Sequence, residues 1–385
     1  MRDDQSIKWY EADVYMNKYV VIGAGILGAT TAYQLAKTGA DVIVIDRKDK
    51  GQATDAAAGI ICPWLSQRRN KAWYHLAKNG ARIYPKLIES LVQDGETDVG
   101  YHRVGAISIH TDEKKLVAMK ERALKRREEA SEIGDVTLLN QEETKELFPL
   151  LSDEYRSVHI SGAARVDGRA LRNALLNASK KHGAKIIQGD ASLLFEKTNI
   201  TGVIVNNHKI FADTVIAASG AWMSDLIKPL GINFIVTAQR AQIMHIQMPN
   251  VNTRNWPVVM PPNNQYLLSF DDRIVVGATH ENDVGFDYRI TAGGLEEVLT
   301  KALQVAPNLA TGTVLETRVG FRPFTPGSLP VIGSLPGYTG LLLANGLGAT
   351  GLTMGPYIGN ELAKLALGKE LDIDIADYNI TEAIQ

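Results

Sequence analysis

A strand, a glycine-rich turn and a helix near the start of the chain constrain its fold more than any other feature. Residues 19–22 read YVVI, an apolar run rich in β-branched side chains that is typical of a parallel strand buried on both faces. Three glycines spaced G-x-G-x-x-G follow, at Gly23, Gly25 and Gly28. The first permits a tight turn, the second lets a pyrophosphate approach the backbone, and the third lets the next helix pack on the strand. We therefore predict a nucleotide-binding unit whose helix, about 26–38, directs free N–H groups at phosphates.

The next segment supports this prediction. Gly39 ends the helix, and residues 42–45 form a second buried strand. Asp46 then stands at the end of that strand, where a carboxylate can accept the hydroxyl groups of an adenosine ribose. A glycine-containing βαβ turn without a ligand is the alternative, but the order strand, turn, helix, strand and acid favours a dinucleotide site.

Length, charge and cysteine content limit the class of protein. The 385 residues exceed what one core usually holds, so we expect two domains. With 41 basic and 43 acidic residues, and no basic run interleaved with aromatic residues, we expect neither nucleic acid nor an anionic membrane surface as a partner. The single cysteine, Cys62, excludes a disulfide framework and a multi-cysteine metal site, and it fits a reducing cytoplasm.

The apolar and polar segments near the N-terminus are not expected to cross a membrane. The apolar stretch 19–36 contains glycines and Gln34 and follows the strand, turn and helix pattern, which argues against a transmembrane segment or a signal peptide. Residues 1–15 are polar and aperiodic and precede Met16, and we interpret them as a flexible leader, or as the product of an upstream start codon, without a role in function.

Three later segments resemble the first junction in character. Residues 51–59 are small and polar, as expected of a loop pressed against a ligand, and Thr54 and Asp55 there could contact phosphate or cap a helix. Residues 213–222 (DTVIAASGAW) lead a strand into a tight turn, and residues 340–356 (GLLLANGLGATGLTMGP) lead a strand through a glycine-rich loop into a helix. Such junctions at both ends of the chain are not expected of a continuous nicotinamide-binding domain. They predict one extended ligand contacted by segments far apart in the sequence.

The central part of the chain reads as a second, β-rich unit. Residues 234–248 form a long strand, and residues 265–270 and 273–278 form a hairpin. A further strand, 317–321, ends at Arg322, whose planar guanidinium suits the carboxylate of an amino acid; a structural ion pair is the alternative. The remaining periodic segments predict helices at 70–91, 112–133, 140–147 and 171–182 and strands at 99–110, 185–188, 192–196, 203–205 and 209–211.

These motifs together resemble a known family. From Met16 onward the chain is similar to the FAD-dependent amino-acid oxidases of the D-amino-acid oxidase superfamily, most closely the bacterial glycine oxidases, with the D-amino-acid dehydrogenase small subunit as a neighbour. The order and spacing of the matching motifs make the resemblance specific. They are VIGAGILG at 21–28, TDAAAGI at 54–60, VIAASGAW at 215–222, YLLSFDDRIVVGATH at 266–280, GFRPFTPGSLPVIG at 320–333 and the loop 346–356.

The resemblance implies an α/β (α+β) fold with a discontinuous Rossmann-like FAD-binding domain and a second, mainly antiparallel-sheet substrate domain. The implied segments are 16–82, 143–222 and 318–371 for the FAD-binding domain, 83–142 and 223–317 for the substrate domain, and 372–385 for a C-terminal tail. Sarcosine-oxidase relatives attach FAD through a cysteine near the GFRPFT segment, and Cys62 is far from it, so we expect non-covalent FAD. The implied FAD-contacting residues are Gly23, Gly25, Ile26, Leu27, Gly28, Asp46, Arg47, Ala53, Thr54, Ala58, Gly59, Ile60, Ser192, Gly220, Trp222, Gly346, Leu347, Gly348, Ala349, Thr350, Gly351, Leu352 and Thr353.

The resemblance also implies how a substrate is held. Arg322 would bind the substrate carboxylate and Tyr266 would share it, although Tyr266 could instead be a core aromatic residue. His280 stands where glycine oxidases carry an apolar residue near the flavin, and a surface histidine is the alternative. Leu347 and Ala349 replace a histidine or an additional arginine of these relatives, which argues against strict specificity for glycine.

The implied reaction is oxidative deamination of glycine, sarcosine or a small D-amino acid by hydride transfer from Cα to flavin N5, with oxygen as acceptor and hydrogen peroxide as product. We expect no catalytic acid–base pair and no metal, because the flavin carries the chemistry. One alternative is a D-amino-acid dehydrogenase that passes electrons to a quinone and associates peripherally with a membrane; another is a non-catalytic nucleotide-binding protein. We expect a cytoplasmic protein without an integral membrane segment, and a homo-oligomer is left open.

Overall fold

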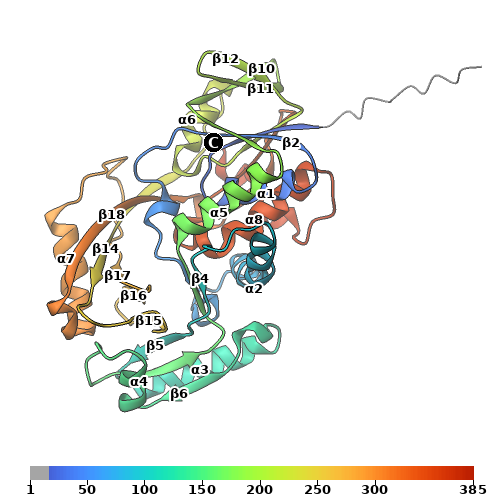
Figure 1. Ribbon diagram of the computed structural model, residues 1–385. Helices are drawn as coiled ribbons and strands as arrows, with labels where there is room; N and C mark the ends of the chain where they lie inside the picture. Colours follow the sequence, from blue (N-terminus) through green and yellow to red (C-terminus); the bar gives the residue numbers. More distant parts are fainter. Residues whose placement is uncertain (1–16) are drawn as a thin grey trace, which may run out of the picture.

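The computed structural model describes residues 17–385, and its core is a mostly parallel sheet beside a larger mixed sheet (Figure 1). The predicted leader, residues 1–15, lies outside the described residues. The parallel sheet has six strands in the order β19-β20-β13-β1-β2-β9, of which β19 is antiparallel to its neighbour. Its strands are β1 (Lys18–Ile22), β2 (Asp41–Asp46), β9 (Lys185–Gln188), β13 (Thr214–Ala217), β19 (Val331–Ser334) and β20 (Leu341–Asn345).

Both faces of the parallel sheet are covered, which explains why its strands are apolar throughout. Tyr19 and Val21 of β1 face a core formed with helices α1, α2 and α8, whereas Val20 and Ile22 face a core formed with α6 and a three-stranded sheet, β10-β11-β12. The bounds are α1 (Ile26–Ala36), α2 (Lys71–Gln93), α5 (Gly168–Lys181), α6 (Met223–Ile227), α8 (Gly351–Ala366), β10 (Ala191–Glu196), β11 (Asn199–Val205) and β12 (His208–Phe211).

The larger sheet has eight strands in the order β18-β14-β17-β16-β15-β5-β7-β6, antiparallel except for the β15-β5 pair. Figure 1 shows α7 at one end of this sheet, and α3 and α4 at the other end. The bounds are β5 (Ala106–His110), β6 (Val136–Leu139), β7 (Arg156–Ile160), β14 (Thr237–Gln247), β15 (Val258–Met260), β16 (Tyr266–Ser269), β17 (Ile274–Gly277), β18 (Thr313–Phe324), α3 (Glu113–Arg127), α4 (Gln141–Leu147) and α7 (Ala292–Val305). A small sheet, β3 (Ile60–Ile61), β8 (Ala164–Val166) and β4 (Tyr101–His102), completes the described part.

This architecture confirms the predicted fold class, a Rossmann-like parallel sheet joined to a mainly antiparallel one. The division of the chain into segments stays a prediction, and α2, α4 and β18 each run across one of its boundaries. Strand β7 lies in the eight-stranded sheet although segment 143–222 was predicted to belong with FAD, and α2 continues to Gln93, past residue 82.

Three predicted elements are clearly wrong in extent. The strand predicted at 317–321 is β18, which runs from Thr313 to Phe324, so Arg322 lies within the strand and not at its end. The strand predicted at 99–110 is two short strands, because the chain turns at Gly105, where φ is 75° and an added Cβ would lie 2.6 Å from His159 Nε2. The helix predicted at 112–133 ends at Arg127 and is followed by a separate 3-10 turn at Ser131–Ile133. In the part of the chain that the structure describes, no helix combines the length and apolar character needed to span a bilayer.

Gly28 shows how tightly the first helix packs on the sheet. It lies inside α1, where alanine is normally preferred over glycine. An added Cβ would lie 1.9 Å from the Gly23 carbonyl oxygen and 3.3 Å from the Ala218 Cβ. The absence of a side chain therefore sets the distance between α1 and the strands beneath it.

We expect Gly28→Ala to lower the free energy of unfolding by about 1 to 3 kcal/mol, because the extra methyl group overpacks a rigid backbone contact. Gly293→Ala is the matched control, since Gly293 is an exposed glycine of α7 with no atom within 4 Å of an added Cβ. That change should be neutral or stabilising by less than about 1 kcal/mol. Urea denaturation measures both, and equal effects of the two substitutions would contradict the packing role.

Candidate active site

A cavity of about 530 Å³ lies at the edge of the parallel sheet where the carboxyl ends of four strands meet. The residues that follow or end these strands line it: Gly23 after β1, Asp46 at the end of β2, Ala218 after β13 and Asn345 at the end of β20. The carboxyl edge of an open parallel sheet is where ligands bind in this class of fold.

The junctions after β1, β13 and β20, which are far apart in the sequence, all line this cavity. All of the predicted FAD-contacting residues except Gly28 and Gly346 line it, and so do Arg322, Tyr266 and His280. Gly28 instead packs against the sheet. Gly346 is turned away from the cavity towards Thr325, whose Oγ1 would lie 1.9 Å from an added Cβ.

The first turn of α1 presents its backbone to the cavity, but one N–H group is already capped. Ile26 N donates to Thr54 Oγ1 at 3.0 Å. Gly25 and Leu27 line the cavity beside it. The sequence analysis allowed Thr54 to contact phosphate or to cap the short helix of its own loop; in the structure it instead caps α1 from the 3-10 turn η1 (Ala53–Ala56).

Asp46 holds the turn after β2 in place. Its carboxylate accepts hydrogen bonds from Ala24 N at 2.6 Å, from Lys48 N at 2.6 Å and from Gln52 Nε2 at 2.8 Å. A carboxylate can accept about four hydrogen bonds, so one site remains for a ribose hydroxyl, and displacing the Gln52 amide would open a second. Arg47, beside it, is engaged by Asp49 at 2.7 Å and by Asp190 at 3.3 Å.

The opposite end of the cavity carries Arg322 on β18. Its Nη1 donates to Gln239 Oε1 at 3.0 Å and approaches the Thr279 carbonyl oxygen at 3.5 Å. Among residues 17–385, no carboxylate forms an ion pair with this partly buried guanidinium. Burial lowers its pKa, and the neighbouring Tyr266 partly offsets the effect. A guanidinium that has only neutral partners in a cavity wall keeps donors and charge that suit an anion.

Tyr266 and His280 lie near the same guanidinium. Burial raises the pKa of Tyr266 to about 12, with Arg322 acting in the opposite direction, so the hydroxyl keeps its proton over the physiological range. Burial followed by the charge of Arg322 lowers the pKa of His280. The residue is exposed and also lines the cavity, so both sequence interpretations of His280 describe part of its position.

Sequence reasoning missed several polar residues of the site. Asn345 donates to the Gly220 carbonyl oxygen at 2.8 Å and accepts from Gly346 N at 2.7 Å, and so joins two junctions. An asparagine at the end of the apolar run LLLAN was the available signal. Gln239 gave none, because only the β14-β18 register places it opposite Arg322.

Comparison with known proteins assigns the chain to a family. The chain matches the FAD dependent oxidoreductase (DAO) family over residues 18–365. It is 63% identical over 371 residues to the uncharacterized oxidoreductase YurR of Bacillus subtilis, covering 96% of this chain and 100% of that protein. It is 29% identical to a glycine oxidase of Pseudomonas aeruginosa, covering 94% of this chain and 98% of that protein.

Solved structures agree. The crystal structure of iminodiacetate oxidase from Chelativorans sp. BNC1 superposes with a TM-score of 0.91 at 43% identity, covering 94% of this chain and 98% of that one. Glycine oxidase from Geobacillus kaustophilus superposes with a TM-score of 0.82 at 25% identity, covering 95% and 98%. The fold, with its cavity at the carboxyl edge of the parallel sheet, is that of an FAD-dependent oxidoreductase. The chain belongs to the family of FAD-dependent oxidoreductases, and its cofactor is FAD.

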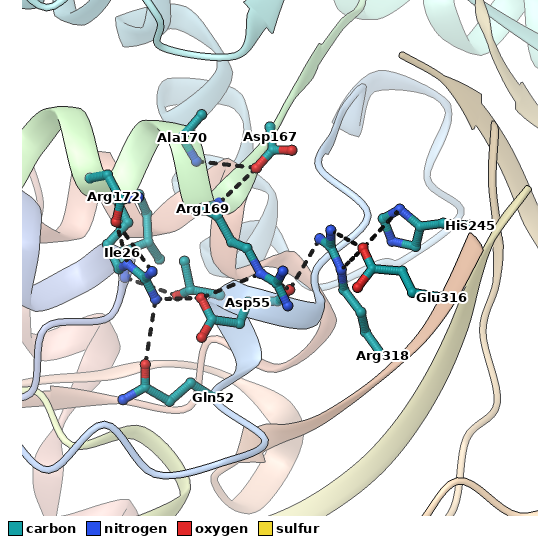
Figure 2. Close-up of polar contacts among 12 residues, drawn as sticks. Ile26, Gln52, Asp55, Asp167, Arg169, Ala170, Arg172, His245, Glu316 and Arg318 are labelled. Atoms are coloured by element: carbon teal, nitrogen blue, oxygen red, sulfur yellow. Dashed lines mark hydrogen bonds and ion pairs between the residues drawn. The ribbon is translucent and has the colours of Figure 1, made fainter. Parts of the chain in front are cut away.

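A network of charged side chains joins the cavity wall to both large sheets (Figure 2). Asp55 of η1 is bound by Arg172 of α5, and its carbonyl oxygen accepts from Arg169 Nε at 3.1 Å. Arg318 of β18 approaches the same carbonyl at 3.4 Å and pairs with Glu316. The turn that carries Thr54 is therefore held between a helix of the parallel sheet and a strand of the eight-stranded sheet.

His245 lies at the far end of this network, buried in β14. Its Nδ1 accepts from Arg273 Nε at 3.0 Å, which fixes the neutral tautomer with the proton on Nε2, and Nε2 has no hydrogen-bond partner among the described residues. Burial and then the charge of Arg318 lower the pKa of His245 to about 4, although Glu316 at 3.8 Å acts in the opposite direction.

We expect this histidine to make the fold sensitive to acid. Its pKa is lower in the folded state than the ordinary value of about 6.5, so between pH 6.5 and 4 the unfolded state binds more protons and stability falls as pH falls. The loss should reach up to about 3 kcal/mol. His245→Asn keeps an acceptor for Arg273 but cannot titrate, so its stability should fall less over this window.

Denaturant unfolding at several pH values measures the effect, with His208→Asn at an exposed site as control. Equal pH dependence of wild type and His245→Asn would show that His245 does not control acid stability.

Proposed function

We propose that this protein oxidises the Cα–N bond of a small amino acid, with FAD bound non-covalently and oxygen as electron acceptor. The observation that carries the proposal is Arg322, a partly buried cation without an acidic partner in the described chain, at the opposite end of the cavity from Asp46. The names of similar proteins support it, because glycine and iminodiacetate are both amines with a carboxylate on the adjacent carbon.

The backbone leaves open space in the cavity for an extended dinucleotide. Gly220, with a φ of 54°, lines it, and an added Cβ there would meet nothing within 4 Å, so the backbone leaves open space for a ligand. Asp46 and Gly25 would hold the adenosine and pyrophosphate end, and the loop Leu347–Thr353 would hold the flavin end. When bound, FAD is the oxidant that accepts two electrons from the substrate.

Cys62 supports non-covalent attachment. It is buried and lines an adjoining second cavity, not this one, and burial raises the pKa of its thiol to about 12. A thiol that keeps its proton is a poor nucleophile.

The chain's own residues bind and orient the substrate. Arg322 would pair with the carboxylate, and the protonated Tyr266 hydroxyl can donate to the same group, so that Cα is fixed relative to the cofactor. His280, with a lowered pKa, is neutral near pH 7 and leaves the positive charge of the pocket to Arg322. Apolar lining residues such as Leu347 and Phe321 exclude water from the reacting bond.

The first test is spectroscopic. We expect the yellow holoprotein to be bleached by an amino acid without oxygen, in a panel of glycine, sarcosine, D-alanine and iminodiacetate, and to release one peroxide per turnover when air is admitted. If the amino acid bleaches the flavin, air gives no peroxide and a quinone restores the yellow colour, the protein is instead a dehydrogenase. A flavin that no amine reduces would contradict the proposed function.

The second test concerns Arg322. Arg322→Ala should lower kcat/KM for the best amino acid by hundreds to thousands-fold, because breaking a buried charge pair costs about 3 to 5 kcal/mol. Arg322→Lys should recover only part, since it keeps the charge but loses the planar fork. FAD content should stay unchanged.

Two controls define the result. Arg289→Ala removes an exposed arginine paired with Asp287 and should leave kcat/KM unchanged. For an amine without a carboxylate, Arg322→Ala should lower kcat/KM only slightly. If kcat/KM falls as much for this amine as for the amino acid, Arg322 is a structural residue.

A further inference from the structure

A second cavity, of about 680 Å³, adjoins the flavin cavity. We call it the vestibule; it lies between residues 60–67, strand β5, helix α3 and residues 260–264. The two cavities share the lining residues Ile60, Asn264, Ala349, Thr350 and Thr353. Ala349 and Thr350 belong to the loop that we assign to the flavin end, so the vestibule meets the first cavity near the site of reaction rather than near Asp46.

The vestibule carries charge of one sign. Lys115 and Arg122 line it, together with His110, and no aspartate or glutamate does. The two cations are seven residues apart on α3, two helical turns, and so project from the same face. The acidic residue that starts the helix, Glu113, is turned elsewhere and pairs with Arg156.

Both cations are free to act on a ligand. Lys115 is exposed, and Arg122 is partly buried with one hydrogen bond, from Nη1 to the Leu65 carbonyl oxygen at 3.4 Å. Within residues 17–385, neither side chain forms an ion pair. By contrast Arg126, one turn further along, is held by the carbonyl oxygens of Trp64 and Ser66 and does not line the vestibule.

We propose that the vestibule is the access route to the flavin cavity, and that Lys115 and Arg122 select there for amino acids with two carboxylates over those with one. This inference rests on the proposed function. A cleft lined by one sign of charge raises the local concentration of oppositely charged ligands, and the effect grows with ligand charge and is screened by salt. Iminodiacetate, the substrate in the name of a structure 43% identical to this chain, is a dicarboxylic amine.

The test compares two secondary amines that differ by one carboxylate, iminodiacetate and sarcosine. In the double variant Lys115→Gln with Arg122→Gln, kcat/KM for iminodiacetate should fall by about 5 to 30-fold at low ionic strength, and that for sarcosine by less than about threefold. The kcat at saturation should not change, and most of the difference should vanish in 0.5 M salt, where the Debye length is only about 4 Å.

The double variant Lys120→Gln with Lys125→Gln is the matched control. It removes the same charge from the same helix, but neither lysine lines the vestibule. If this control lowers kcat/KM for iminodiacetate relative to sarcosine by the same factor, the effect comes from the overall charge of the protein and the vestibule does not select the substrate. Equal losses for both substrates in the first variant would overturn the proposal as well.

A binding measurement keeps the inference separate from the proposed function. Oxydiacetate and methoxyacetate contain an ether oxygen in place of the amine, so neither can be oxidised to an imine, and their binding is followed through the absorbance of the oxidised flavin. In the double variant of Lys115 and Arg122, the Kd for oxydiacetate should rise at least threefold more than the Kd for methoxyacetate. This ratio decides the role of the vestibule even if no amine reduces the flavin, a result that would overturn the proposed function alone. A ratio of one would overturn the vestibule proposal.

Discussion

The close approach of helix α1 to the parallel sheet is the constraint on which the rest of the site depends. Gly23 and Gly28 leave no room for a side chain between the turn, the helix and Ala218 of the neighbouring strand. Because the helix is seated so closely, its first turn reaches the edge where β1, β2, β13 and β20 all end. A cavity for an extended ligand forms there, and its walls come from several separate parts of the chain.

The two large sheets are held together around this cavity by charge rather than by apolar packing alone. Asp55 receives arginines from α5, and Arg318 reaches the same turn from β18. Asp167 extends the link, since one oxygen caps α5 and the other pairs with Arg273 of the eight-stranded sheet at 2.8 Å. Such partly buried networks contribute little net stability but fix geometry, because each member has satisfied partners only in one arrangement. The cofactor-side turn and the substrate-side strand therefore keep a fixed separation.

The distribution of charge along the cavities suits a substrate and a cofactor that are both anionic. At one end, Asp46 accepts hydrogen bonds from backbone N–H groups and an amide, whereas Arg322 at the other end has only neutral partners. Lys115 and Arg122 extend the positive region outward along the vestibule. The same electrostatic logic, cations left without acids where a carboxylate is expected, connects the proposed function with the proposed selectivity.

The sequence by itself determined the parallel sheet, its glycine-rich junctions and the family, since the G-x-G-x-x-G turn, the buried β-branched strands and the later junctions are local patterns with a direct conformational cause. The family resemblance of their motifs predicted that Arg322, Tyr266 and His280 share one site, and all three line the cavity. Only the tertiary structure decided that Gly28 and Gly346 pack away from the cavity, that Thr54 caps α1, and that Gln239 rather than an acid faces Arg322. These are properties of register and of contacts between distant segments. The pairing of β14 with β18, or of α3 with residues 62–67, leaves no trace in the local sequence, because side-chain periodicity specifies which face of an element is buried but not what lies opposite it.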